Sequence, residues 1–142
     1  MISNPKSGWC DFQLGDFKGT PSYLTDVPIN LLNAFIDYYT KGYGVAVFDE
    51  EGSFFTLIIT SYNLGIFIIE EKDSSILHDF SDFQIEDLEE ELIEDIEKDL
   101  LGWTKFIVGN TPEEFAEHQN NIKLKIAQLK TIIGGEAGEI YR

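Results

Sequence analysis

The sequence has little of what builds covalent, metal-based or membrane-embedded structures. A single cysteine, Cys10, excludes an internal disulfide framework, and with only two histidines no zinc cluster of cysteine and histidine ligands can form. The longest apolar run, Leu64 to Ile69, is far shorter than the ~20 residues that a membrane-spanning helix needs. Residues 1–8 contain no apolar stretch of the kind found in secretory signals, so we expect a cytoplasmic protein.

Basic residues are also scarce. The chain has 10 lysines and arginines against 26 aspartates and glutamates, which gives a formal net charge of -16. Phosphate groups are bound by clustered lysines and arginines, so this balance argues against nucleic acids and anionic membranes as partners. The 142 residues, 43% of them hydrophobic, are enough to bury a core without disulfides or metals. We therefore expect one acidic globular domain that spans residues 1–142.

The hydrophobic pattern predicts the α+β class. Residues 43–70 alternate apolar segments with turns, and they predict an antiparallel β-meander of three strands with a hairpin turn at Asp49–Gly52. Amphipathic periodicity and capping residues predict three helices packed around this meander, at residues 28–40, 83–107 and 112–133. The segment before the first helix is expected to form a short irregular hairpin.

The core can be predicted from the same periodicity. The middle strands of the meander are apolar on both faces, so we expect other elements to cover both faces of the sheet. Residues 136–142, which follow the Gly134–Gly135 pair, are predicted to be a tail. The apolar side chains predicted to form the core are Phe35, Val47, Phe55, Leu57, Ile59, Phe67, Leu88, Leu92, Ile96, Ile122, Ile126 and Leu129.

Acidic residues are concentrated in one segment. Residues 70–99 hold 14 acids and two lysines, whereas residues 100–142 carry equal numbers of acidic and basic residues. On a helix, the acids of residues 86–97 form two parallel rows outside the apolar stripe. Like charges at this i,i+4 spacing destabilise a helix by about 0.2–0.5 kcal/mol per pair. The residues predicted to bind a partner are Glu86, Asp87, Glu90, Glu91, Glu94, Asp95 and Glu97.

Two interpretations of this acidic segment are open. It either keeps the protein soluble as a solvated helix face, or it binds a strongly cationic protein. In the second case, its charge would speed association and select that partner over others. Solubility alone does not require two unmixed rows, because a mixture of glutamate and lysine would stabilise the helix better. The spacing of an EF-hand loop is absent, so a specific calcium site is not indicated.

Catalytic groups are not indicated by the sequence. The spacings typical of serine nucleophiles and of glycine-rich phosphate-binding loops are absent. We interpret Cys10 as a small buried hydrophobe, His118 as a packed histidine and His78 as a surface histidine. We therefore predict no catalytic residue, metal or cofactor, and no enzymatic activity. The alternative is a small enzyme or a ligand-binding domain with a pocket near Trp9 and Cys10.

In charge and architecture the chain resembles the small acidic bacterial immunity and antitoxin proteins of toxin–immunity systems. The resemblance rests on the acidic segment Glu70 to Asp99, within a small α+β domain that lacks a catalytic set. Such proteins bind a basic toxin, often a nuclease, and cover its cationic active site. The resemblance therefore implies an inhibitor whose acidic helix face neutralises a cognate cationic toxin.

Overall fold

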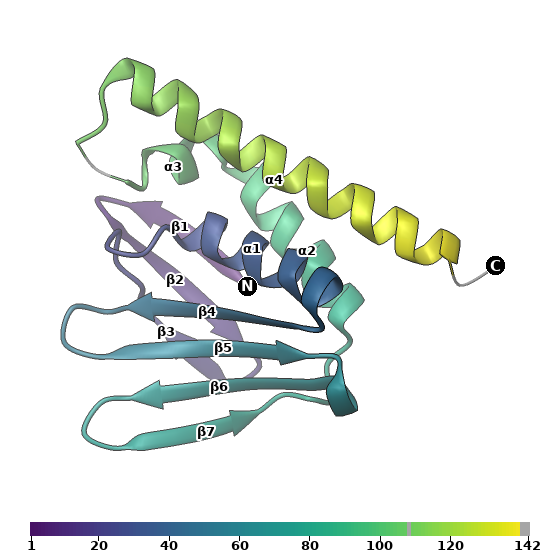
Figure 1. The fold of residues 1–142 in the computed structure, drawn as a ribbon. Coiled ribbons are helices and arrows are strands. Elements are labelled where there is room, and N and C mark those ends of the chain that lie inside the picture. The colour runs from purple at the N-terminus through teal and green to yellow at the C-terminus, as the bar shows by residue number, and fades with distance from the viewer. Residues whose placement is uncertain (108, 140–142) are drawn as a thin grey trace.

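The computed structural model describes residues 1–107 and 109–139. In these ranges, two antiparallel sheets and four helices make up the fold (Figure 1). The strands are β1 (Ile2–Lys6), β2 (Trp9–Leu14), β3 (Phe17–Gly19), β4 (Tyr43–Asp49), β5 (Phe54–Thr60), β6 (Gly65–Glu71) and β7 (Ser75–Asp79). The helices are α1 (Val27–Lys41), α2 (Ile85–Lys98), α3 (Leu100–Lys105) and α4 (Pro112–Glu139), with a single 3-10 turn, η1 (Tyr62–Leu64). The predicted α+β class is confirmed.

The predicted meander is present and has one strand more than expected. β4, β5 and β6 pair in antiparallel order, and β7 extends the sheet to the order β4-β5-β6-β7. The chain reverses between β4 and β5 at the predicted turn, where the N–H of Glu50 donates to the carbonyl of Ser53 at 2.9 Å. The sequence does not predict β7. Its five residues, Ser-Ile-Leu-His-Asp, follow a polar turn and do not alternate between apolar and polar residues.

The N-terminal segment forms a second sheet of order β1-β2-β3. The predicted hairpin is present as β2 and β3, and β1 adds a third strand that contains Pro5 and a register shift, two features that obscure a strand pattern. Phe12 and Phe17 of this sheet pack against Phe55 of the larger sheet, and in both pairs the ring centroids are 5.0 Å apart. The two sheets therefore share one aromatic core.

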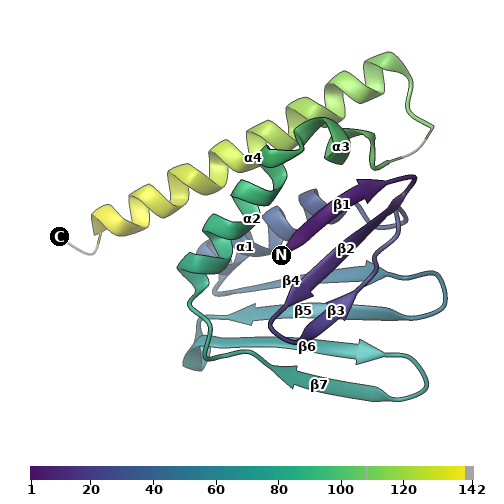
Figure 2. The same cartoon turned by 180° about the vertical axis from the view of Figure 1, so that it is seen from behind.

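We call the face of the large sheet that the small sheet covers its inner face. α1 packs against this inner face, mainly over β4 (Figure 2). The contact is close because β4 has a glycine where the helix approaches: a Cβ atom on Gly44 would lie 1.8 Å from the carbonyl oxygen of Ala34. The helix ends at Gly42, which adopts a left-handed conformation (φ 87°) and donates its N–H to the carbonyl of Tyr38. The helix predicted at residues 28–40 is therefore confirmed to within one residue at each end.

No helix or strand in the described part of the chain covers the outer face of the large sheet, so the prediction that both faces are covered is wrong. The helices and the small sheet all lie on the inner side (Figures 1 and 2). Strict alternation along β4 turns Ala46 and Phe48 inward and leaves Val47, which we predicted in the core, 46% exposed. Phe67, also predicted in the core, points outward from β6 and is only half-buried. The other ten predicted core residues are buried.

The long helix predicted at residues 83–107 is two helices. α2 starts at Ile85, and the backbone leaves the helical conformation at Asp99 (φ -143°, ψ 55°) before α3 begins. The carboxylate of Asp99 accepts a hydrogen bond from the N–H of Gly102 at 3.0 Å and so caps α3. A Cβ atom on Gly102 would lie 2.4 Å from that carboxylate, so the glycine makes room for the cap.

α4 begins as predicted and ends later than predicted. In its capping box the N–H of Glu114 donates to Oγ1 of Thr111 (3.2 Å), and the N–H of Thr111 donates to Oε1 of Glu114 (3.4 Å). The helix then continues through Gly134 and Gly135 to Glu139. Residues 136–139 of the predicted tail are therefore helical, and residues 140–142 lie outside the described part. None of the helices in the described ranges has the length and hydropathy needed to cross a membrane.

Candidate interaction site on the acidic helix

The apolar stripe of α2 fixes where its acids point. Leu88, Leu92 and Ile96 are buried, so the predicted phase of the helix is confirmed. The two acidic rows therefore lie on opposite flanks of the buried stripe. We call them the β1 flank and the groove flank. The β1 flank consists of Asp87, Glu91 and Asp95. The groove flank consists of Glu86, Glu90, Glu94 and Glu97.

Two acids of the β1 flank form contacts within the fold. Oδ2 of Asp95 accepts hydrogen bonds from the amine of Met1 at 2.7 Å and from the N–H of Ile2 at 3.1 Å. The carboxylate of Glu91 also binds that amine. These contacts attach β1 to α2, so Glu91 and Asp95, which we predicted to bind a partner, have a structural role in this fold.

The groove flank faces a hollow between α2 and α4. The two helices diverge from the region of α3 (Figure 2), and the groove between them has a volume of about 450 Å³. Ile93 and Ile133 provide apolar surface, and the four glutamates of the groove flank stand around it. Lys130 of α4 also lines the groove, and its ammonium lies 3.3 Å from the carboxylate of Glu97. The arrangement combines an apolar floor with an excess of negative charge.

Glu89 lies at the inner edge of this groove and is 1% exposed, although helical periodicity places it on the outward arc. The hydroxyl of Tyr39 on α1 donates a hydrogen bond to its carboxylate. Burial raises the pKa of Glu89 to about 7, the hydrogen bond from Tyr39 opposes that shift, and the negative charge of Glu86 adds to it. Burial and the same hydrogen bond also raise the pKa of Tyr39. The sequence signal for Glu89 was its position one turn from Leu92 and Ile93, beside the buried stripe.

The side chains considered for catalysis occupy packed positions. Cys10 is buried, and burial with the nearby charge of Asp11 raises the pKa of its thiol to about 12, so it is not a nucleophile near neutral pH. His118 lies between two acceptors, with Nε2 2.8 Å from Oδ2 of Asp26 and Nδ1 2.9 Å from the carbonyl of Thr104. Both contacts need a ring N–H, and the hydrogen bond to Asp26 raises the pKa of His118. This histidine therefore connects α1, α3 and α4.

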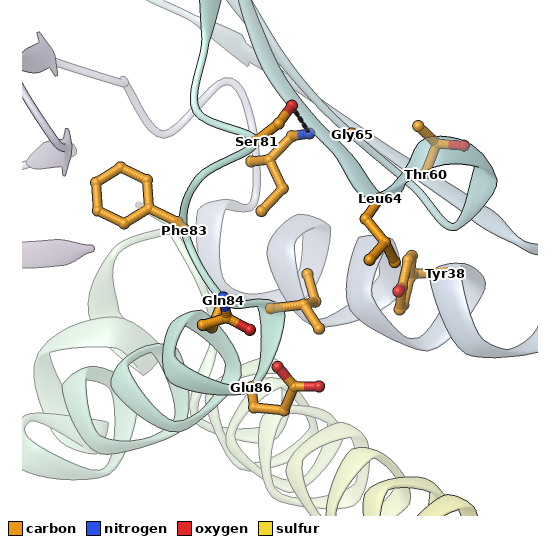
Figure 3. A pocket seen from close by; sticks show the side chains of 10 residues that line it. Tyr38, Thr60, Leu64, Gly65, Ser81, Phe83, Gln84 and Glu86 are labelled. Atoms are coloured by element: carbon orange, nitrogen blue, oxygen red, sulfur yellow. Dashed lines mark hydrogen bonds between the residues drawn. The ribbon is translucent and has the colours of Figure 1, made fainter.

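A small pocket adjoins the groove where α2 begins. It has a volume of about 120 Å³, and Figure 3 shows Tyr38, Leu64 and Phe83 around it, with Glu86 at the border with the groove. The hydroxyl of Ser81 accepts the N–H of Ile66 at 3.1 Å, so its oxygen already has a partner in the fold. Pockets that hold small-molecule substrates are usually ~300–1,000 Å³, so this one is too small to define a substrate site. Trp9 and Cys10, named for the alternative ligand site, do not line it.

Within residues 1–107 and 109–139, no group of three or more His, Cys, Asp or Glu side chains is arranged to hold a metal ion. Comparison with protein families, curated sequences and solved structures gave no significant match. The features that bear on function are therefore those of the chain itself, and the groove between α2 and α4 combines more of them than any other surface described above.

Proposed function

We propose that the protein is an immunity-type inhibitor that binds and neutralises a cationic protein toxin. The observation that carries this proposal is the groove flank. Four glutamates surround an apolar floor, and the one lysine that lines the groove is already paired with Glu97. A partner segment with apolar side chains between lysines or arginines would complement both properties of the groove. Action in the cytoplasm, as we expect from the sequence, is part of the proposal.

The charge distribution favours this function over that of a solvated surface. Residues 70–99 hold 14 acids and two lysines, and α2 presents the groove flank without mixed charge. A surface of one sign accelerates encounter with a partner of opposite sign and disfavours other partners. Because dissolved ions screen exposed charges beyond ~10 Å at 0.1 M salt, this acceleration should fall steeply as salt is added.

We divide the predicted partner-binding residues between two roles. We assign Glu86, Glu90, Glu94 and Glu97 to partner binding, because they line the groove. Asp87, Glu91 and Asp95 lie on the other flank, where the last two hold the start of β1. A charge reversal that includes Asp95 would damage the fold as well as binding, so the test is restricted to the groove flank.

The test is co-production with the products of the genes that neighbour its own. We expect one of them to stop growth when produced alone, to be tolerated with the parent chain, and to bind it with an affinity that falls as salt rises. The variant Glu86→Lys, Glu90→Lys, Glu94→Lys should bind at least ~100-fold more weakly, a loss of about 2.7 kcal/mol.

A matched control carries three reversals elsewhere, at the exposed acids Asp16, Glu51 and Glu117. It changes the net charge by the same amount and should retain most of the affinity and the protection of growth. Equal loss in both variants would mean that only overall charge matters. Full binding by the groove variant would contradict the assignment of partner binding to α2.

A further inference from the structure

The two edges of the large sheet differ in how their backbone groups are satisfied. At the β4 edge, the carbonyl of Asp49 accepts the N–H of Ser22 at 2.8 Å, and the N–H of Asp49 donates to Oγ1 of Thr25 at 3.1 Å. Further along, Nδ2 of Asn30 donates to the carbonyl of Val47 at 3.0 Å. These contacts from the segment before α1 and from α1 itself close that edge to another strand.

The β7 edge is open. β7 is the last strand of the sheet in the described part of the chain, and Figures 1 and 2 show it at the border with no element beyond it. The N–H of Phe80 donates to the carbonyl of Ile66, which places a hydrogen-bonded pair just after β7. In antiparallel strands such pairs alternate with pairs that are not hydrogen-bonded. The backbone groups of His78 and Ile76 therefore face β6, and those of Ser75, Leu77 and Asp79 face outward.

The side chains of β7 do not discourage pairing. Edge strands are commonly protected by lysine, proline or a bulge, and β7 has none of these. Instead, Leu77 is 63% exposed and Ile76 is 47% exposed. In the register of the sheet Leu77 lies opposite Ile69 and Asp79 lies opposite Phe67, so both belong to the open outer face.

We propose that β7 is a second docking site, at which an extended segment of a cationic partner protein adds to the sheet as a fifth strand. In antiparallel pairing, an apolar side chain of that segment would lie beside Leu77 and a lysine or arginine beside Asp79. Main-chain hydrogen bonds to Ser75, Leu77 and Asp79 would provide affinity, and these two side-chain contacts would provide specificity. The site involves neither α2 nor its groove, so it is independent of the function proposed above.

The local charge favours a cationic partner over a second copy of this chain. In an antiparallel pair of two copies centred on Leu77, Ser75 of the second copy would lie opposite Asp79 and would offer it no cation. Residues 70–79 contain four acids and one lysine, so the net negative charge of this region also disfavours a second copy. The hydrogen bonds that Asp79 receives from Ser81 lower its pKa, so its carboxylate is ionised at neutral pH. Among the described residues this carboxylate has hydrogen-bond donors but no cation, so it attracts a lysine or arginine on the incoming strand.

The probe for this site is the synthetic peptide Thr-Lys-Thr-Val-Thr-Thr-Thr, capped at both ends. Paired antiparallel, it places its lysine beside Asp79 and its valine beside Leu77. Short strands bind weakly, so we expect a dissociation constant of about 1 mM. At about 5 mM peptide, hydrogen exchange of the Leu77 and Asp79 amides, followed by NMR, should slow by about sixfold. The same peptide with glutamate in place of lysine should protect them less.

Two variants separate backbone pairing from charge. Leu77→Pro removes an outward N–H that β6 does not use, and should abolish protection of Asp79, whereas Leu77→Thr keeps the N–H and should retain part of it. Because proline could also disturb β7, Asp79→Lys gives a second test with every backbone group present: it should reverse the preference, so that the glutamate peptide protects better.

The proposal is overturned if the peptide protects neither amide, or if Asp79→Lys leaves the preference between the two peptides unchanged. It is also overturned if sedimentation shows a dimer that Leu77→Pro dissociates, because the occupant of the edge would then be a second copy. Charge reversal on the groove flank should not change the protection, so failure here and failure of the proposed function give different results.

Discussion

The two flanks of α2 both carry rows of carboxylates on the same helix, and the main difference between them is what lies beside each row. On the β1 flank, Asp95 and Glu91 bind the amine of Met1, and Asp95 also binds the N–H of Ile2. On the groove flank, the glutamates face a hollow whose single lysine is held by Glu97. Acids of one flank therefore hold the fold together, while most acids of the other flank have no cation in the described part of the chain.

This difference shows that helical periodicity locates the acids on the helix surface. It does not show which acids form contacts within the fold and which are left to bind a partner. The sequence places both rows outside the apolar stripe, and the structure confirms that geometry. Whether a carboxylate is paired depends on segments that are more than 30 residues away along the chain, such as β1 and α4. Substitutions on α2 test the difference between the flanks, and the buried stripe that separates them comes first.

The largest effect is expected at Leu92, which is fully buried on the stripe between the two flanks. Leu92→Ala should lower the free energy of unfolding by about 2–5 kcal/mol, because it removes buried methyl groups and leaves a cavity. Urea unfolding followed by circular dichroism measures the change. If the unfolding midpoint does not move, the stripe is not buried as described and the two flanks are not separated.

A matched pair of neighbouring residues tests the comparison directly. Asp95→Asn removes the charge that binds the Met1 amine, and should lower the free energy of unfolding by about 1–3 kcal/mol. Glu94→Gln removes a charge from the groove flank, and should change stability by less than about 0.5 kcal/mol. Chemical denaturation of both variants in the same buffer gives the two values. Equal losses would remove the distinction between a structural and a binding flank.

What the sequence could predict is what depends on neighbouring residues. The end of α1 at Gly42, the hairpin turn before β5 and the capping box at Thr111 each depend on a few consecutive residues, and all are confirmed. Val47 and Phe67 were misplaced because their strands are apolar on both faces, so composition alone does not show which face is covered.

For the candidate site, the position of the acidic helix was predictable and the groove was not. On the α4 side the groove is lined by Lys130 and Ile133, which lie within the predicted helix. What the sequence does not show is that α4 packs mainly against α1 and α3 and so leaves a hollow beside α2. The break at Asp99 likewise depends on its own hydrogen bond to Gly102, which shortens α2 relative to the periodic pattern. The burial of Glu89 depends on Tyr39, about 50 residues earlier in the chain.

Glu89 belongs to neither flank and predicts a dependence of stability on pH. Its folded pKa of about 7 lies above the unfolded value near 4.3, so the native state binds the proton more tightly. Its contribution to stability is therefore complete below about pH 4 and is lost as pH rises from about 4 to 7. Glu89→Gln cannot ionise, so the stability of this variant relative to the parent should increase over that range.

Urea unfolding of both proteins at several pH values measures this difference. Glu90→Gln is the matched control, because Glu90 is exposed one residue further along the helix, and its difference from the parent should stay constant with pH. A Glu89→Gln difference that is equally constant would mean that the carboxylate is ionised throughout, in spite of its burial.

The smallest effect is expected on the groove flank itself. Glu90 has Glu86 and Glu94 one turn away on either side. Glu90→Ala removes the repulsion between Glu90 and these two glutamates, and alanine also has the higher helix propensity. Each relieved pair contributes about 0.2–0.5 kcal/mol, so the variant's free energy of unfolding should stay the same or rise by up to about 1 kcal/mol at low salt. The gain should shrink in 1 M salt, where screening reduces repulsion between exposed charges to a range of ~3 Å. Thermal melts at the two salt concentrations distinguish relief of charge repulsion, which depends on salt, from the loss of a contact that salt does not screen. A loss of more than about 1 kcal/mol would show that Glu90 is used inside the fold, as Asp95 is, and the row would then not be reserved for a partner.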